Sequence, residues 1–150
     1  EVWQQVVRHI NQRWKLPIVE IGLDRLVIDT KEKLNRTLCG NLSILESAEV
    51  IRRSQLYLGS DSGPAHLANA VGTYGIIALG SLLQFRRSVP YSGPYANGQN
   101  SSLIQHDGPV AEVPIGRFIQ AIDHRLGLLV EMTESQSTSG QNSACLIDYE

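Results

Sequence analysis

The residues with the clearest potential for chemistry lie in one short turn, at positions 59–66. The turn holds a carboxylate, Asp61, a glycine, Gly63, and a histidine one helical turn later, His66. An apolar run precedes the turn. A run of small residues that begins at Pro64 overlaps its end and continues beyond it. A strand, a polar turn and a helix start place backbone N–H groups that lack helical partners beside polar side chains. Such a place binds phosphate or another anion.

Each residue of the turn has an expected task. Gly63 lets a ligand approach the backbone closely. Ser62 can donate its hydroxyl and its N–H group, and His66 can face the same ligand as a cation or as a neutral donor. Asp61 would repel a phosphate. We therefore expect its carboxylate to accept hydrogen bonds from sugar hydroxyls, or to hold the loop through backbone N–H groups.

Two other interpretations of the turn are open. Asp61 and Ser62 could simply cap the following helix, which is a common use of both residue types, and His66 could be a structural histidine. A hydrolase is disfavoured, although the turn contains the residue types of a catalytic triad. Asp61 occupies the centre of 59–63, where the G-x-S-x-G nucleophile elbow needs a serine, and triad members normally come from separate loops.

The composition fits one ordinary globular domain. The chain has 150 residues, 42% hydrophobic and 19% charged, with a formal net charge of −2, which disfavours a nucleic-acid binder that relies on phosphate neutralisation. No apolar run approaches the roughly 20 residues that span a bilayer. The four histidines are scattered and no C-x-x-C pair exists, so a metal site is not expected.

The two cysteines, Cys39 and Cys145, fit a reducing compartment, so we expect a cytoplasmic protein. The chain starts at Glu1 without a methionine or a basic segment, and we expect it to be part of a longer protein.

The hydrophobic periodicity predicts alternating helices and strands. Helices are expected over 1–14, from the capping pair Ser43 and Glu46 onward, over 64–72 and over 115–126; strands are expected over 18–21, 26–29, 55–58, 74–79 and 102–105; loops are expected over 31–41 and 81–102. This order predicts a Rossmann-like three-layer α/β/α fold with a mostly parallel sheet. Ligands collect beyond the carboxyl ends of such strands, where the turn at 59–66 lies.

The segment from Leu42 to Thr73 resembles the C-terminal domain of glycosyltransferase family 9, the ADP-heptose:lipopolysaccharide heptosyltransferases. The resemblance rests on a leucine–serine helix start, an apolar strand, the motif D-S-G-x-x-H and a small-residue helix, and it extends over roughly residues 40–80. It implies the C-terminal half of a GT-B fold, in which two Rossmann-like domains face a cleft and no metal or cofactor is required. The C-terminal half holds a nucleotide-diphosphate sugar, and the N-terminal half supplies the acceptor site and the general base.

The resemblance also implies roles for single residues. Asp61, Ser62, Gly63 and His66 would surround the diphosphate and the adjoining sugar, and Leu42 would pack against the base or the ribose. No catalytic residue is expected in this chain, because the general base belongs to the other domain.

Three further parts of the sequence bear on the resemblance. Residues 22–24 correspond to a region that touches the nucleoside. Tyr74 stands where the family often has proline. Arg86 and Arg87 either belong to a solvated loop or contact phosphate across the cleft.

The resemblance therefore predicts the donor-binding domain of an enzyme that transfers a heptose-like sugar from an ADP-heptose-like donor to a glycan or lipopolysaccharide. The expected domain spans residues 1–130, followed by a disordered or loosely attached tail over 131–150, whose central part is highly polar. The expected partner is an N-terminal GT-B domain; nucleic acid and a transmembrane segment are not expected. The expected location is the cytoplasm, including the inner face of the cytoplasmic membrane, and the chain alone is expected to be inactive. Two alternatives are a nucleotide-sugar epimerase-like GT-B domain and a non-catalytic nucleotide- or anion-binding module.

Overall fold

The computed structural model describes residues 2–25, 36–81, 91–135 and 144–148. The helices are α1 (Val2–His9), which continues as a π-helical turn (Ile10–Trp14), α2 (Ile44–Arg52), α3 (Gly63–Val71) and α4 (Ile115–Ser135), with a 3-10 turn at Val110–Glu112. The strands are β1 (Ile18–Ile21), β2 (Arg36–Thr37), β3 (Ser54–Ser60), β4 (Gly75–Leu79), β5 (Ser101–Gln105) and β6 (Ala144–Asp148).

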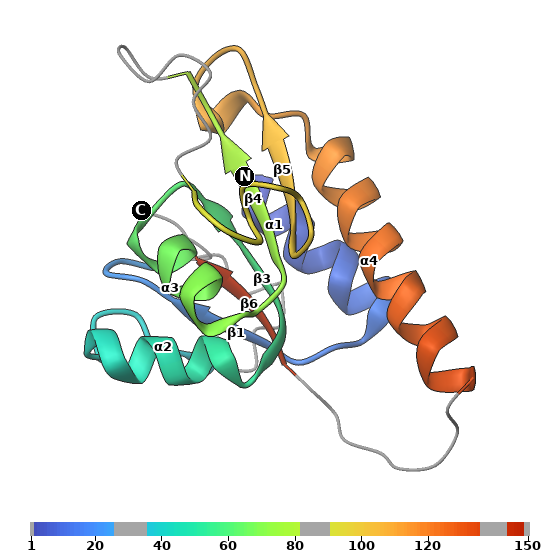
Figure 1. Ribbon diagram of the computed structural model, residues 1–150, viewed down its shortest axis with the longest axis horizontal. Helices are drawn as coiled ribbons and strands as arrows, with labels where there is room; N and C mark the ends of the chain where they lie inside the picture. The colour runs from blue at the N-terminus through green and yellow to red at the C-terminus, as the bar shows by residue number, and fades with distance from the viewer. Residues whose placement is uncertain (1, 26–35, 82–90, 136–143, 149–150) are drawn as a thin grey trace.

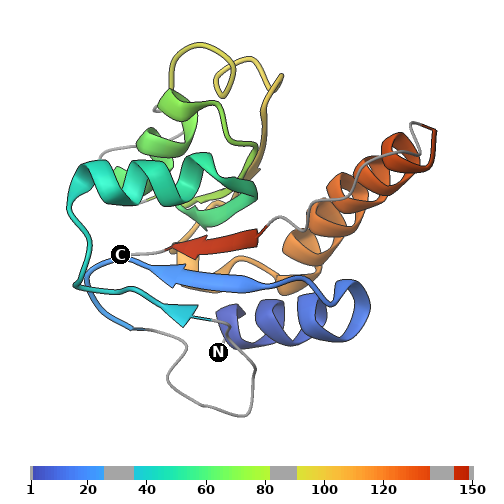
Figure 2. The ribbon, with the colours of Figure 1, turned by 90° about the horizontal axis from the view of Figure 1, so that it is seen from below.

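The strands form one sheet in the order β2-β1-β6-β3-β4-β5, and all neighbours are parallel. Helices α2 and α3 cover one face of the sheet, while α1 and α4 lie against the other (Figure 1 and Figure 2). This architecture confirms the predicted α/β class with a Rossmann-like arrangement. Helices on both faces explain why the centre of β3 and nearly all of β4 are continuous apolar runs.

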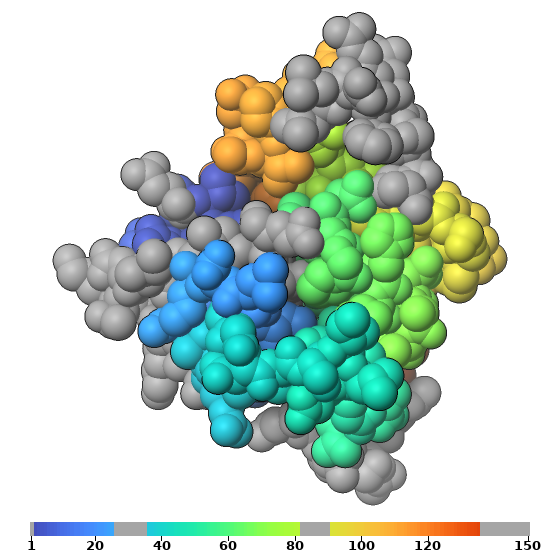
Figure 3. All heavy atoms as spheres, turned by 90° about the vertical axis from the view of Figure 1, so that its left-hand side faces the viewer, coloured from blue at the N-terminus to red at the C-terminus, as the bar shows by residue number. Residues whose placement is uncertain are grey.

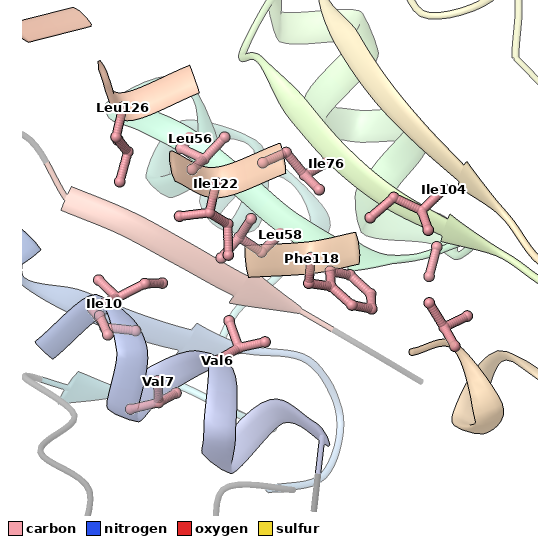
Figure 4. Packing of buried hydrophobic residues seen from close by; sticks show 13 residues of the cluster. Val6, Val7, Ile10, Leu56, Leu58, Ile76, Ile104, Phe118, Ile122 and Leu126 are labelled. Carbon is pink, nitrogen blue, oxygen red and sulfur yellow. The ribbon is translucent and has the colours of Figure 1, made fainter. Parts of the chain in front are cut away.

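Side chains of the central strands alternate between two cores. Leu56 and Leu58 pack with α1 and α4, where Phe118 and Ile122 lie against them (Figure 4). Tyr57, between them in sequence, packs with α2 and α3 instead. All of these side chains are at most 1% exposed. The period of two along a strand therefore builds both cores at once.

Local sequence signals set the ends of two helices as predicted. The amide of Ser43 donates to Glu46 Oε2 at 2.8 Å and the amide of Glu46 donates to Ser43 Oγ at 3.3 Å, which is a complete capping box at the start of α2. Hydrogen bonds from the Ser43 amide and the Ser43 hydroxyl to the Glu46 carboxylate lower the pKa of Glu46. Helix α3 ends at Gly72, whose φ of 78° is left-handed and suits glycine.

Helices α1 and α4 are tied together by one carboxylate. Asp123 Oδ1 lies 2.7 Å from His9 Nε2 and accepts a hydrogen bond from Trp14 Nε1 at 2.7 Å. Partial burial acts to raise the pKa of Asp123, but the hydrogen bonds from His9 and Trp14 outweigh it, and the pKa is lowered. The charged form of Asp123 therefore stabilises this corner of the fold.

The C-terminal part of the chain differs from the expected loose tail over 131–150. Helix α4 continues to Ser135, and Ala144–Asp148 form β6, which pairs with β1 on one side and β3 on the other. The polar composition of the intervening segment obscured a short apolar run that fills the middle of the sheet. A two-residue strand, β2, also lies within the expected loop 31–41, whereas the extended piece expected over 26–29 lies outside the described residues.

In the described parts of the chain, no helix combines the length and the apolar character needed to cross a membrane.

Candidate functional site

The turn that follows β3 lies at the carboxyl edge of the parallel sheet. The amide of Asp61 donates to the carbonyl of Ala78 at 3.1 Å, which keeps the turn against the end of β4. Helix α3 begins immediately afterwards, at Gly63. The sheet therefore places the predicted residues at the edge where open α/β sheets bind ligands. Figure 3 views the side of the molecule that carries α2 and α3.

The start of α3 offers fewer backbone donors than a helix N-terminus usually does. The carbonyl of Ser62 accepts hydrogen bonds from the amides of Ala65, at 3.1 Å, and His66, at 3.3 Å. Pro64 has no N–H group. Among the described residues, no acceptor takes the amide hydrogen of Gly63. The start of α3 therefore offers a ligand fewer backbone N–H groups than the sequence predicted. The Gly63 amide is the clearest of those that remain.

Ser62 is the N-cap residue of α3, but its side chain makes no capping hydrogen bond. Its backbone is extended, with φ −153° and ψ 172°, and the residue is 6% exposed. The simple interpretation of Ser62 as a side-chain cap is therefore wrong. The serine supplies the carbonyl that begins the helix, rather than an oxygen that caps it.

Gly63 has room in front of it. A Cβ atom built on this glycine would meet no atom of the described residues within 4 Å, and the φ of Gly63 lies outside the left-handed region. Neither the conformation of the backbone nor packing within the protein therefore requires a glycine here. Open space beside the Cα atom of Gly63 is what the close approach of a ligand to this backbone would use.

Asp61 and His66 are brought together, and a third residue joins them. His66 Nε2 lies 3.9 Å from Asp61 Oδ1, and both side chains are substantially exposed, at 53% and 41%. The hydroxyl of Tyr91 donates to Asp61 Oδ1 at 2.9 Å. The Tyr91 ring also lies against the His66 ring, with centroids 4.8 Å apart and planes at 47°.

Tyr91 was not predicted as a site residue. It lies 30 positions after Asp61, in a segment of glycines, prolines and small polar residues where one aromatic carries little signal. The structure buries it to 6% exposure and packs its ring edge-on against Tyr95, at 5.5 Å between centroids. Burial, together with the hydrogen bond to Asp61, raises the pKa of Tyr91 far above its usual range. The phenol is therefore protonated at neutral pH and acts as the donor.

Leu42 is partly buried and packs against the core beneath α2 and α3. The segment after β1 lies beside it in the fold, since the amide of Gly40 donates to the carbonyl of Gly22 at 2.8 Å. Three large apolar side chains of this region are strongly exposed: Leu23 at 82%, Ile44 at 73% and Leu45 at 81%.

Tyr74 has a structural place. Its hydroxyl lies 2.8 Å from Ser102 Oγ, and the Arg125 guanidinium lies over its ring at 4.1 Å. It thus links the start of β4 to β5 and to α4, which a proline at this position would not do. Arg86 and Arg87 lie outside the described residues. Where the chain is described, no group of three His, Cys, Asp or Glu side chains is placed to hold a metal ion.

The fold and the turn define a Rossmann-like domain with a polar strand–turn–helix at its carboxyl edge. Residues 21–86 match the family model of glycosyltransferase family 9 (heptosyltransferase). The resemblance seen in the sequence is thus confirmed over a segment that contains Leu42 and the turn from Asp61 to His66. No curated protein and no solved structure matches the chain.

Proposed function

We propose that this domain binds the nucleotide-diphosphate sugar donor of a glycosyltransferase at the turn from Asp61 to His66. The observation that carries the proposal is the juxtaposition of three unlike groups at one sheet edge within the matched segment. These groups are the Gly63 amide, the exposed His66 ring and the Asp61 carboxylate. A donor of this class presents a diphosphate and sugar hydroxyls side by side, and the turn offers partners for both.

The proposed contacts follow the charges of the groups. The Gly63 N–H group points to the diphosphate, where the positive end of the α3 dipole adds to its effect. His66 donates a hydrogen bond to the same group. Asp61 has one oxygen, Oδ2, that takes no hydrogen bond from the described residues, and this oxygen accepts from a sugar hydroxyl.

The domain would contribute to the chemistry by stabilising the leaving group. Glycosyl transfer breaks the bond between the anomeric carbon and the diphosphate, so negative charge grows on the diphosphate in the transition state. Donors that are fixed in advance lower the energy of that charge without reorganisation. The general base for the attacking hydroxyl is assigned to an N-terminal domain, and this chain alone is expected not to turn over.

The exposed apolar side chains Leu23, Ile44 and Leu45 support a partner that covers this region. Large apolar side chains left exposed in one region of the chain are typical of a surface that another domain covers. We assign the partner as the N-terminal GT-B domain. A heptose-like sugar, an ADP-heptose-like donor, a glycan or lipopolysaccharide acceptor and a cytoplasmic location, including the membrane face, belong to the same proposal.

The test is isothermal titration calorimetry with ADP, UDP and GDP and with ADP-glucose, UDP-glucose and GDP-mannose. At least one nucleoside diphosphate should bind together with its sugar nucleotide. His66→Ala should weaken that binding about tenfold, as expected for loss of one hydrogen bond to a charged group. His124→Ala is the matched control, because this histidine is exposed on α4 and lies outside the proposed site. Absence of binding by every nucleotide at millimolar concentration would overturn the proposal.

A further inference from the structure

We propose that Tyr91 is a positioning residue that sets the sugar specificity of the site by fixing the Asp61 carboxylate. The inference rests on the proposed donor-binding function and deepens it. It is carried by one contact between distant parts of the chain, the 2.9 Å hydrogen bond from the Tyr91 hydroxyl to Asp61 Oδ1.

The hydrogen bond gives the two oxygens of Asp61 different tasks. Oδ1 accepts from Tyr91 and is the oxygen that faces His66 Nε2, at 3.9 Å. Oδ2 has no partner among the described residues and is left for a ligand. An exposed aspartate rotates freely about its side-chain bonds, whereas one oxygen held by a buried donor directs the other. The direction in which Asp61 accepts a hydrogen bond therefore depends on Tyr91.

Tyr91 is itself held rigidly. Its ring is buried against Tyr95, and the Tyr95 hydroxyl donates to the carbonyl of Thr73 at 2.6 Å. Tyr95 also occupies the space beside Gly75, where any side chain would collide with its ring. Tyr91 therefore packs on a residue that is anchored at the start of β4. This packing holds the Tyr91 hydroxyl in position.

The same ring limits the movement of His66. With centroids 4.8 Å apart, the two rings are in contact, and His66 is otherwise exposed. Tyr91 therefore sets the position of the Asp61 carboxylate, which accepts from the sugar hydroxyl, relative to the His66 imidazole. A ligand that engages both groups must match this separation, which would discriminate among sugars rather than among bases.

Tyr91→Phe tests the inference, because it keeps the ring and removes only the hydroxyl. The affinity of wild type and variant is measured by calorimetry for the nucleoside diphosphate and the sugar nucleotide of the pair that binds. We expect the sugar nucleotide to bind about tenfold more weakly, the effect of one lost hydrogen bond to a charged group. The affinity for the nucleoside diphosphate should stay within about twofold of wild type. A general structural defect would instead weaken the binding of both ligands.

Two further variants make the test specific. Tyr74→Phe is the matched control, since it also removes a partly buried phenol hydroxyl, which lies 2.8 Å from Ser102 Oγ and outside the site. It should leave the ratio of the two affinities unchanged. In an Asp61→Asn background, Tyr91→Phe should add little, because both substitutions affect one acceptor.

An unchanged affinity ratio in Tyr91→Phe, with binding of the nucleoside diphosphate intact, would overturn the role of Tyr91 and leave the proposed function standing. Failure of both ligands to bind the wild-type chain would overturn the two proposals together.

Discussion

The space in front of Gly63 allows a test that separates ligand binding from folding. Substitution by alanine adds a Cβ atom that meets nothing within 4 Å in the described parts of the chain, and the backbone φ is ordinary. The effect on stability is then limited to helix propensity, which favours alanine over glycine by about 0.5–1 kcal/mol. Urea denaturation should therefore show a Gly63→Ala protein at least as stable as wild type.

Binding should move in the opposite direction. A side chain at this position occupies the approach to the Gly63 amide, and Gly63→Val blocks it more fully than Gly63→Ala. Loss of one hydrogen bond between an amide and a charged diphosphate costs about 1.5–3 kcal/mol, which is roughly a ten- to hundredfold rise in Kd. Calorimetry with the best nucleoside diphosphate measures this directly.

Gly116→Val is the control for this experiment, because that glycine lies in α4, a Cβ built there also meets nothing within 4 Å, and the position is outside the proposed site. If Gly63→Val bound the nucleotide as tightly as wild type, the diphosphate would not lie at this amide. If Gly63→Ala proved strongly destabilising, the open space itself would be wrong.

Three predictions concern the scaffold. Gly75→Ala should lower the free energy of unfolding by about 1–3 kcal/mol in urea, because the new Cβ would lie 2.7 Å from Tyr95 Cζ and force the ring to shift; an unchanged midpoint would contradict this packing. Asp123→Ala should cost about 1–3 kcal/mol at pH 7, since it removes the acceptor of two hydrogen bonds. The lowered pKa of Asp123 means that its contribution is present above the ordinary aspartate pKa of about 3.9 and is lost as the pH falls through the lowered value. The wild-type and variant curves should therefore converge in acid, and a constant difference down to pH 2 would argue against the pair. A chain ending at Ser135 lacks β6 and leaves the facing edges of β1 and β3 without a partner strand in the middle of the sheet. It should lose cooperative thermal unfolding and associate in size-exclusion chromatography, whereas a monomer with an unchanged melting curve would show that β6 is dispensable.

The sequence was sufficient where the determining interactions are local. The capping box at Ser43 and Glu46 and the left-handed glycine at position 72 involve residues within four positions of one another, so their spacing alone specifies them. The continuous apolar run over Leu56–Leu58 likewise indicates burial on both faces, which requires helices on both sides of the sheet. These signals fixed the fold class and the place of the turn.

The interactions that the sequence did not disclose are long-range. Tyr91 meets Asp61 across 30 positions of the sequence, and no periodicity encodes that contact. The middle position of β6 is a property of the sheet order, which a five-residue apolar run cannot specify. The number of backbone amides left free at the start of α3 also depends on which carbonyls the turn places nearby.

This limited number of donors has a consequence for affinity. A phosphate site made of several converging N–H groups binds an anion by itself, whereas the clearest free amide here is that of Gly63, beside the negative charge of Asp61. The diphosphate alone should then bind weakly, and the nucleoside and sugar should supply most of the affinity. Inorganic pyrophosphate should displace a bound nucleoside diphosphate only at about a hundredfold higher concentration than the unlabelled nucleotide does, a difference of about 2.7 kcal/mol. Displacement by pyrophosphate and by nucleotide at similar concentrations would show that the anion is held by donors beyond those of this turn.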